Sequence, residues 1–260
     1  MQKKLGIMKR AAFTLLCAAG CLGLLTATSA VFFFALGDSG APEEREDEIP
    51  AEQAAAPPAS SGSLVLEDGF VQPDDWRLVL VNFETPVPSG CEPELIAVGS
   101  VQVDKRIEED LTAMMEAAAK EGLTITLSSG YRSTERQAEL FQNAVEENVE
   151  LGMNLEMAEA VAAESVARAE YSEHSTGLAV DLNGVLETFD ETAEYRWLLR
   201  HAHEYGFVLR YPEDKADVTK IRFEPWHFRY VGAEHASKMR LLNLCLEEYL
   251  LYLDAQTGGS

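Results

Sequence analysis

Two stretches of the sequence decide how this chain folds: Ser172-Glu173-His174-Ser175-Thr176-Gly177-Leu178-Ala179-Val180-Asp181 and Glu224-Pro225-Trp226-His227. In the first stretch, Gly177 permits a tight turn, and the apolar residues that follow predict a short strand over residues 178–182. His174 is then expected on the preceding loop and Asp181 near the far end of the strand. In the second stretch, Pro225 biases the preceding residue away from the helical region, which predicts an extended or turning backbone. About forty residues separate the two stretches, so the fold must bring them together.

The two stretches together carry the residue types of a hydrolytic metal site. His174, Asp181 and His227 offer two imidazoles and a carboxylate, a ligand set that suits zinc and leaves one coordination position open. Glu224 adds a spare carboxylate that can transfer protons. A lone buried His or Asp is more often a hydrogen-bonded structural residue, and it is the combination that favours a metal site.

These residues resemble the VanY-type zinc D-alanyl-D-alanine carboxypeptidases of bacterial cell walls, which are relatives of the peptidoglycan amidase and hedgehog signalling folds. The resemblance rests on the first stretch, on the second stretch with its continuation to Gly232, and on Ser128-Ser129-Gly130-Tyr131-Arg132-Ser133. It covers the chain from about Leu78 to the C-terminus. The resemblance implies His174, Asp181 and His227 as zinc ligands and Glu224 as the catalytic base.

The resemblance also implies roles for three further polar residues. The fork-shaped guanidinium of Arg132 would grip the free carboxylate of a peptide or the developing oxyanion, although a surface ion pair is the simpler alternative. Gln137 and Ser172 match family positions that touch substrate. A helix surface and a loop explain their polarity about equally well, so the residues alone leave these two roles open.

Residues 64–260 are expected to form a single catalytic domain. Periodicity predicts helices over residues 104–121, 134–146, 155–169, 191–205 and 233–253, and strands over residues 123–127, 178–182, 207–211 and 222–224. Residues 77–82 are expected to form a strand or an extended arm. Helices and strands at such short intervals predict an α+β domain. Its small, largely antiparallel sheet would be flanked by helices and would carry the site, and the resemblance implies a hedgehog or D-Ala-D-Ala peptidase-like fold.

The N-terminal region predicts a membrane anchor. Residues 1–10 are basic, and residues 11–37 form an uncharged apolar run that is longer than the ~20 residues needed to span a bilayer. Cleavage after Ala30 and a lipid-modified Cys21 are the alternatives. Basic residues on the N-terminal side keep that end in the cytoplasm, which places the rest of a single-pass protein outside the cell. Residues 38–63 are rich in Pro, Ala, Ser and acidic residues and predict a disordered linker.

Composition limits the partners of the chain. Its 260 residues, 47% of them apolar, suffice for one sizeable core, and the formal net charge of −23 argues against nucleic acid as a partner. Cys91 and Cys245, which lie beyond the apolar run, are candidates for a disulfide that the sequence cannot decide. Nothing in the sequence indicates an oligomeric state.

The activity implied by the resemblance is that of a zinc D,D-carboxypeptidase that removes C-terminal D-Ala from peptidoglycan stem peptides, and the N-terminal region predicts that it is membrane-anchored and extracellular. One alternative is a zinc enzyme that hydrolyses a different peptide bond of the same substrate, either an L,D-carboxypeptidase or an endopeptidase. The other is a non-catalytic wall-binding module of the same fold. Loss of the spare acid would favour such a module, and Glu224 is present.

Overall fold

The structure is a computed structural model that describes residues 75–257. The basic segment 1–10, the expected anchor over residues 11–37 and the expected linker over residues 38–63 lie outside this range. Within residues 75–257, no helix combines the length and the apolar character needed to cross a bilayer.

A four-stranded antiparallel sheet forms the centre of the described domain. Its strand order is β3–β4–β6–β5, with β3 at Leu127–Ser129, β4 at Ala179–Leu182, β6 at His227–Tyr230 and β5 at Phe207–Leu209. The two central strands, β4 and β6, are buried along their whole length. The α+β fold with a small antiparallel sheet is therefore confirmed, and the strand expected at residues 178–182 is its centre.

Alternation along β4 and β6 separates a core face from a polar face. Val180, Leu182, Phe228 and Tyr230 belong to the main apolar cluster, which they share with α1 (Glu108–Lys120) and α4 (Ala193–His201). Successive side chains of a strand point to opposite faces, so Asp181, His227 and Arg229 lie on the other face. The register places Asp181 directly opposite His227 on the neighbouring strand. Core packing on one face thus fixes the polar residues on the other.

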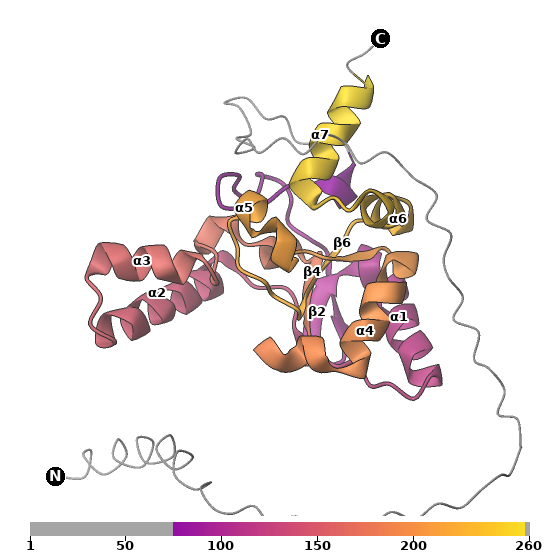
Figure 1. The fold of residues 1–260 in the computed structure, drawn as a ribbon, viewed down its shortest axis with the longest axis horizontal. Helices are drawn as coiled ribbons and strands as arrows, with labels where there is room; N and C mark the ends of the chain where they lie inside the picture. Colours follow the sequence, from indigo (N-terminus) through magenta and orange to yellow (C-terminus); the bar gives the residue numbers. More distant parts are fainter. Residues whose placement is uncertain (1–74, 258–260) are drawn as a thin grey trace, which may run out of the picture. The chain divides into compact units, whose positions relative to one another are not determined.

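Two further groups of elements pack around the sheet. The helices α6 (Ala233–Leu242) and α7 (Leu246–Thr257) share a second apolar cluster with Leu78, Leu80 and Val231. The helices α2 (Thr134–Glu150) and α3 (Leu155–Ala163) lie side by side around a small cluster of their own (Figure 1). The remaining elements are the hairpin β1 (Leu95–Val98) and β2 (Val101–Asp104), the short helix α5 (Ala216–Thr219), and 3-10 turns at Trp76–Leu78, Lys105–Ile107, Ala169–Tyr171, Glu173–Thr176, Glu187–Glu191, Ala202–Tyr205 and Glu213–Lys215.

Several expected elements differ from the structure. Of the two possibilities for residues 77–82, the strand does not form: the segment begins in a 3-10 turn, and the carbonyl oxygens of Arg77 and Val79 accept hydrogen bonds from the buried Arg229 guanidinium. The strand expected at residues 123–127 begins only at Leu127, and the Thr126 amide donates instead to the Asn183 side chain. The β1–β2 hairpin was not predicted.

The C-terminal half contains further differences. Residues 222–224 are not a strand, because the His227 amide donates to the Glu224 carbonyl and closes a turn. The helix expected at residues 233–253 is two helices, broken where Asn243 adopts a left-handed conformation with φ 51°. Both Cys91 and Cys245 are free thiols, so the structure contains no bridge between them; Cys91 packs against the main apolar cluster and Cys245 is buried.

Candidate metal centre

Three elements bring the predicted metal ligands together. His174 lies in the 3-10 turn Glu173–Thr176, Asp181 in β4, and His227 at the start of β6. The turn depends on Gly177, whose φ is +70°, and a Cβ atom there would lie 2.7 Å from the Asp104 amide nitrogen. Only glycine fits this close approach without displacing the backbone.

The three side chains form a compact, buried cluster. Asp181 Oδ1 lies 3.4 Å from His174 Nε2 and 3.3 Å from His227 Nδ1, and one ligand atom from each residue lies within 4.8 Å of the others. Asp181 Oδ1 is buried and accepts no hydrogen bond from the described residues. A bare carboxylate oxygen that faces two imidazole nitrogens fits a tetrahedral zinc ion with one position left for water or substrate.

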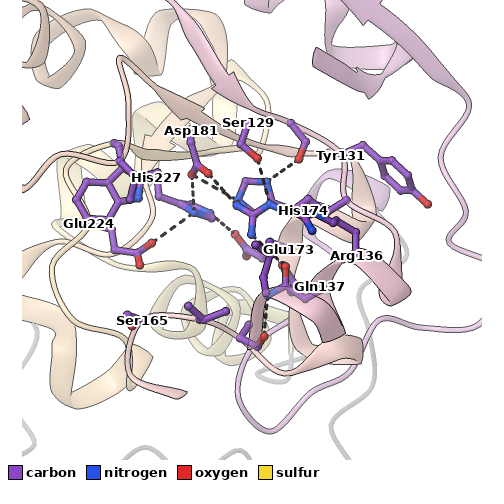
Figure 2. A pocket seen from close by; sticks show the side chains of 18 of the residues that line it. Ser129, Tyr131, Arg136, Gln137, Ser165, Glu173, His174, Asp181, Glu224 and His227 are labelled. Atoms are coloured by element: carbon purple, nitrogen blue, oxygen red, sulfur yellow. Dashed lines mark hydrogen bonds and ion pairs between the residues drawn. The ribbon is translucent and has the colours of Figure 1, made fainter. Parts of the chain in front are cut away.

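Each imidazole is oriented through its second nitrogen. His174 Nδ1 lies 2.7 Å from the Gly130 carbonyl oxygen and donates to it, which leaves the Nε2 lone pair facing Asp181. His227 is turned the other way, because its Nδ1 faces Asp181 and Glu224 while its Nε2 lies 3.5 Å from Glu173 Oε2. Figure 2 shows His227 between these three carboxylates.

The surroundings shift the pKa values of the ligand residues. Burial opposes the charge on Asp181, but the neighbouring imidazoles hold the pKa of its carboxyl well below the usual range. Burial lowers the pKa of His174. For His227, burial is outweighed by Asp181, Glu173 and Glu224, which raise its pKa to about 9. A metal ion at Nδ1 would therefore displace a proton from this ring.

Glu224 lies next to the cluster without belonging to it. Its Oε2 is 3.5 Å from His227 Nδ1, and its backbone is held by a hydrogen bond from its amide to the Tyr211 carbonyl. Burial raises the pKa of the Glu224 carboxyl to about 7. A carboxyl of this kind can both accept and return a proton near neutral pH.

Arg132 reaches the ligand cluster. Its Nη2 lies 2.6 Å from His174 Nε2 and donates to Asp181 Oδ2 at 2.8 Å. Its Nη1 donates to Gln137 Oε1 at 3.0 Å, and Gln137 Nε2 donates in turn to the Ala167 carbonyl at 2.7 Å. The structure thus places Gln137 as a support for Arg132, with both ends of its amide engaged within the protein. Ser172 is buried in the wall of the same cleft.

A cleft of about 850 Å³ opens from the cluster. Its floor holds His174, Asp181, His227 and Glu224, and one wall is the face of α2. The wall formed by α2 includes Arg136, Leu140, Asn143 and Glu147. Other lining residues are Val185, Ile221 and Arg222. The cleft extends far beyond the cluster and offers room for a chain several residues long.

Sequence reasoning missed Glu173, which lies fully buried behind His227. Its Oε1 accepts hydrogen bonds from Arg210 and Arg229, both also buried. An acidic residue in a polar loop gives no sign of burial. Two arginines in apolar surroundings could have indicated it: Arg210 at the end of one apolar strand and Arg229 between Phe228 and Tyr230. A buried guanidinium needs a carboxylate partner, so such arginines predict a buried acidic residue.

Comparison with known proteins agrees with this geometry. The family model described as VanY, D-alanyl-D-alanine carboxypeptidase, matches residues 100–233. A D-alanyl-D-alanine carboxypeptidase of Enterococcus faecalis is 41% identical over 200 residues, which cover 76% of this chain and 73% of the relative.

Two solved structures are similar in fold. One is a mutant of the vancomycin resistance D,D-pentapeptidase VanY from a VanB-type cassette, in complex with Zn(II), with 41% identity, a TM-score of 0.63, and coverage of 67% of this chain and 99% of that chain. The other is the LD-carboxypeptidase LdcB, with 35% identity, a TM-score of 0.60, and coverage of 70% and 90%. The zinc of the first structure and the cluster of His174, Asp181 and His227 identify zinc as the cofactor. The chain belongs to the VanY family of D-alanyl-D-alanine carboxypeptidases, which makes it a zinc-dependent enzyme.

Proposed function

We propose that this protein is a membrane-anchored, extracellular D,D-carboxypeptidase that removes the terminal D-Ala from peptidoglycan stem peptides. The observation that carries the proposal is the ligand cluster with Arg132 and Glu224 beside it, at the floor of a long cleft. A cleft of about 850 Å³ suits a stem peptide better than a free dipeptide. The D,D preference is supported by the 41% identity with a D-alanyl-D-alanine carboxypeptidase.

Each polar residue of the cluster has a distinct chemical task in this proposal. Zinc held by His174, Asp181 and His227 supplies Lewis acidity, which acidifies water and polarises a peptide carbonyl. Glu224 accepts the proton of the attacking water and later returns it to the amine of the leaving D-Ala.

Arg132 meets the negative charge that develops on the carbonyl oxygen. Its Nη2 lies within hydrogen-bonding distance of two ligand residues, His174 and Asp181. The terminal carboxylate of a substrate lies roughly one residue length, about 3.5 Å, beyond the scissile carbonyl. The position of Arg132 within the cluster therefore favours contact with the oxyanion over contact with the terminal carboxylate.

Product analysis tests this proposal. The purified protein is incubated with pentapeptide and tetrapeptide stems, with and without a chelator, and the products are identified by mass spectrometry. We expect loss of one D-Ala from the pentapeptide and no reaction in chelator. Trimming of the tetrapeptide alone would contradict the D,D assignment.

The similarity to LdcB, an LD-carboxypeptidase, supports a second candidate in which the same centre trims the tetrapeptide stem. An endopeptidase on the same substrate would instead cut cross-linked dimers in the same assay. A non-catalytic wall-binding module does not agree with membership of this enzyme family or with the presence of Glu224.

The cellular location is part of the proposal and rests on the sequence. The basic segment 1–10 and the apolar run 11–37 support a single-pass anchor with the catalytic domain outside. We expect the full chain in the membrane fraction and a chain that starts at residue 38 in the soluble fraction. Protease added to intact cells should digest the domain, and protection from that protease would place it inside.

A further inference from the structure

Glu173 connects the metal ligand His227 to a group of buried charges. Among residues 75–257, four buried side-chain atoms lack a hydrogen-bond partner, and three of them belong to Glu173, Asp181 and His227. Two of these atoms, Glu173 Oε2 and His227 Nε2, face each other at 3.5 Å, the outer limit of a hydrogen bond. Both atoms are buried.

The facing pair settles which nitrogen of His227 carries a proton. A histidine that binds a metal through one nitrogen donates the N–H of the other to a carboxylate or carbonyl, which fixes its tautomer and ring orientation. Nδ1 of His227 faces the metal cluster, so Nε2 must carry the hydrogen. Glu173 Oε2, at 3.5 Å, is the carboxylate oxygen that faces this nitrogen. His174 uses the Gly130 carbonyl for the same purpose.

A neutral network of four buried charges holds Glu173 in place. Its Oε1 accepts from Arg210 Nε at 2.8 Å and from Arg229 Nη1 at 2.7 Å. The other nitrogens of Arg210 donate to both carboxylate oxygens of Glu247 in α7, at 2.6 and 2.9 Å. Two carboxylates and two guanidiniums cancel, so the network imposes no net charge on the centre.

The network reaches beyond the part of the chain that the family model matches, residues 100–233. Glu247 lies in α7 and also accepts a hydrogen bond from Asn82 at 3.2 Å. Arg229 Nη2 donates to the carbonyl oxygens of Arg77 and Val79. Both ends of the described chain therefore support the carboxylate that faces His227.

We propose that Glu173 is a positioning residue for the metal ligand His227, and that α7 and the segment 75–82 hold it in register through Arg210 and Arg229. The proposal rests on the proposed zinc site and goes beyond it. A hydrogen bond from a metal-binding histidine to such a carboxylate typically accounts for 10- to 100-fold in metal affinity.

The test is zinc affinity of the full chain in detergent, measured by competition with a chromophoric chelator. We expect Glu173→Gln to bind zinc about 10- to 100-fold more weakly than the unmodified protein. Glu173→Asp keeps the charge and should recover part of this loss. The matched control is Glu170→Gln, an exposed glutamate three residues earlier, which should leave the affinity unchanged.

A second readout separates positioning from a general loss of structure. The Nε2–H of His227 should give a slowly exchanging, downfield proton signal in the NMR spectrum of the zinc-loaded protein, and Glu173→Gln should shift it. Circular dichroism identifies variants that do not fold. If Glu173→Gln is one of them, Glu247→Gln leaves both oxygens of Glu173 in place and should weaken zinc binding through Arg210 by a smaller factor.

The outcomes distinguish this inference from the proposed function. An unmodified protein that binds no zinc overturns the zinc site itself. If the unmodified protein binds zinc, and a folded Glu173→Gln binds it equally tightly with an unchanged His227 signal, only the positioning role is wrong. An equal loss in Glu170→Gln would also overturn that role, because the effect would then follow overall charge.

Discussion

Replacement of Glu224 by glutamine should separate catalysis from metal binding and from stability. The amide keeps the size of the side chain and cannot accept the proton of water. Glu224 is 5% exposed and lies beside the ligands without being one of them. General base catalysis typically contributes 10²- to 10⁴-fold, so kcat should fall by about that factor, or about 3–5 kcal/mol, while zinc content stays the same.

The same substitution should stabilise the metal-free protein at alkaline pH. Burial raises the pKa of Glu224 from 4.5 to about 7, so ionisation of this carboxyl opposes folding once the pH passes its ordinary value. The raised pKa therefore leaves the free energy of unfolding unchanged at low pH. Above about pH 7 it lowers that free energy by the full amount. This decrease is at most about 3 kcal/mol, and glutamine removes it.

The measurements are kcat for D-Ala release, zinc by elemental analysis, and melting in chelator at pH 5 and pH 8. The control is Glu147→Gln, an exposed glutamate on the wall of the same cleft. Turnover within about threefold of the unmodified enzyme would place the base elsewhere. Loss of zinc would make Glu224 a ligand, and equal melting temperatures at pH 8 would refute the argument from burial.

Four further predictions address other parts of the molecule. Removal of zinc by a chelator should abolish D-Ala release and added zinc should restore it in proportion to metal content, whereas full activity in metal-free protein would refute the mechanism. Arg132→Ala should lower kcat more than it raises KM, with partial recovery in Arg132→Lys; steady-state kinetics with an unchanged kcat would assign Arg132 to ground-state binding or to structure. Gly130→Ala should lower the free energy of unfolding in urea by about 1–3 kcal/mol, because the added Cβ would collide with the Gln102 carbonyl oxygen. Burial raises the pKa of the Cys245 thiol to about 12, so iodoacetamide at pH 8 should label Cys91 and spare Cys245 in peptide maps of the native protein.

The candidate ligands could be predicted because metal binding demands particular residue types. His174, Asp181, His227 and Glu224 occur in two short stretches, and strand alternation places Asp181 where the structure has it. The register of β4 with β6 places Asp181 opposite His227. This register is set by the packing of the two strands in the core, which the local sequence pattern does not determine.

The supporting charges could not be predicted in the same way. Glu173 pairs with Arg210 and Arg229, which are 37 and 56 residues away in sequence. Alternation along β6 assigns Arg229 to the face opposite Phe228, and hydropathy then suggests a solvent-exposed face. The segment 75–82 covers that face, and nothing local to β6 encodes this cover.

The α2–α3 pair has a consequence for how specificity can change. Val145, Ala158 and Ala162 give this pair a small core of its own, separate from the one that packs against β4 and β6. Its outer helix face forms a wall of the cleft but supplies none of the metal ligands. Apart from Gln137, which holds Arg132, mutations can therefore accumulate along this wall and change which peptides fit, without contact with the metal cluster. An architecture of this kind lets one catalytic apparatus diversify its substrates through the variable positions of a single helical hairpin.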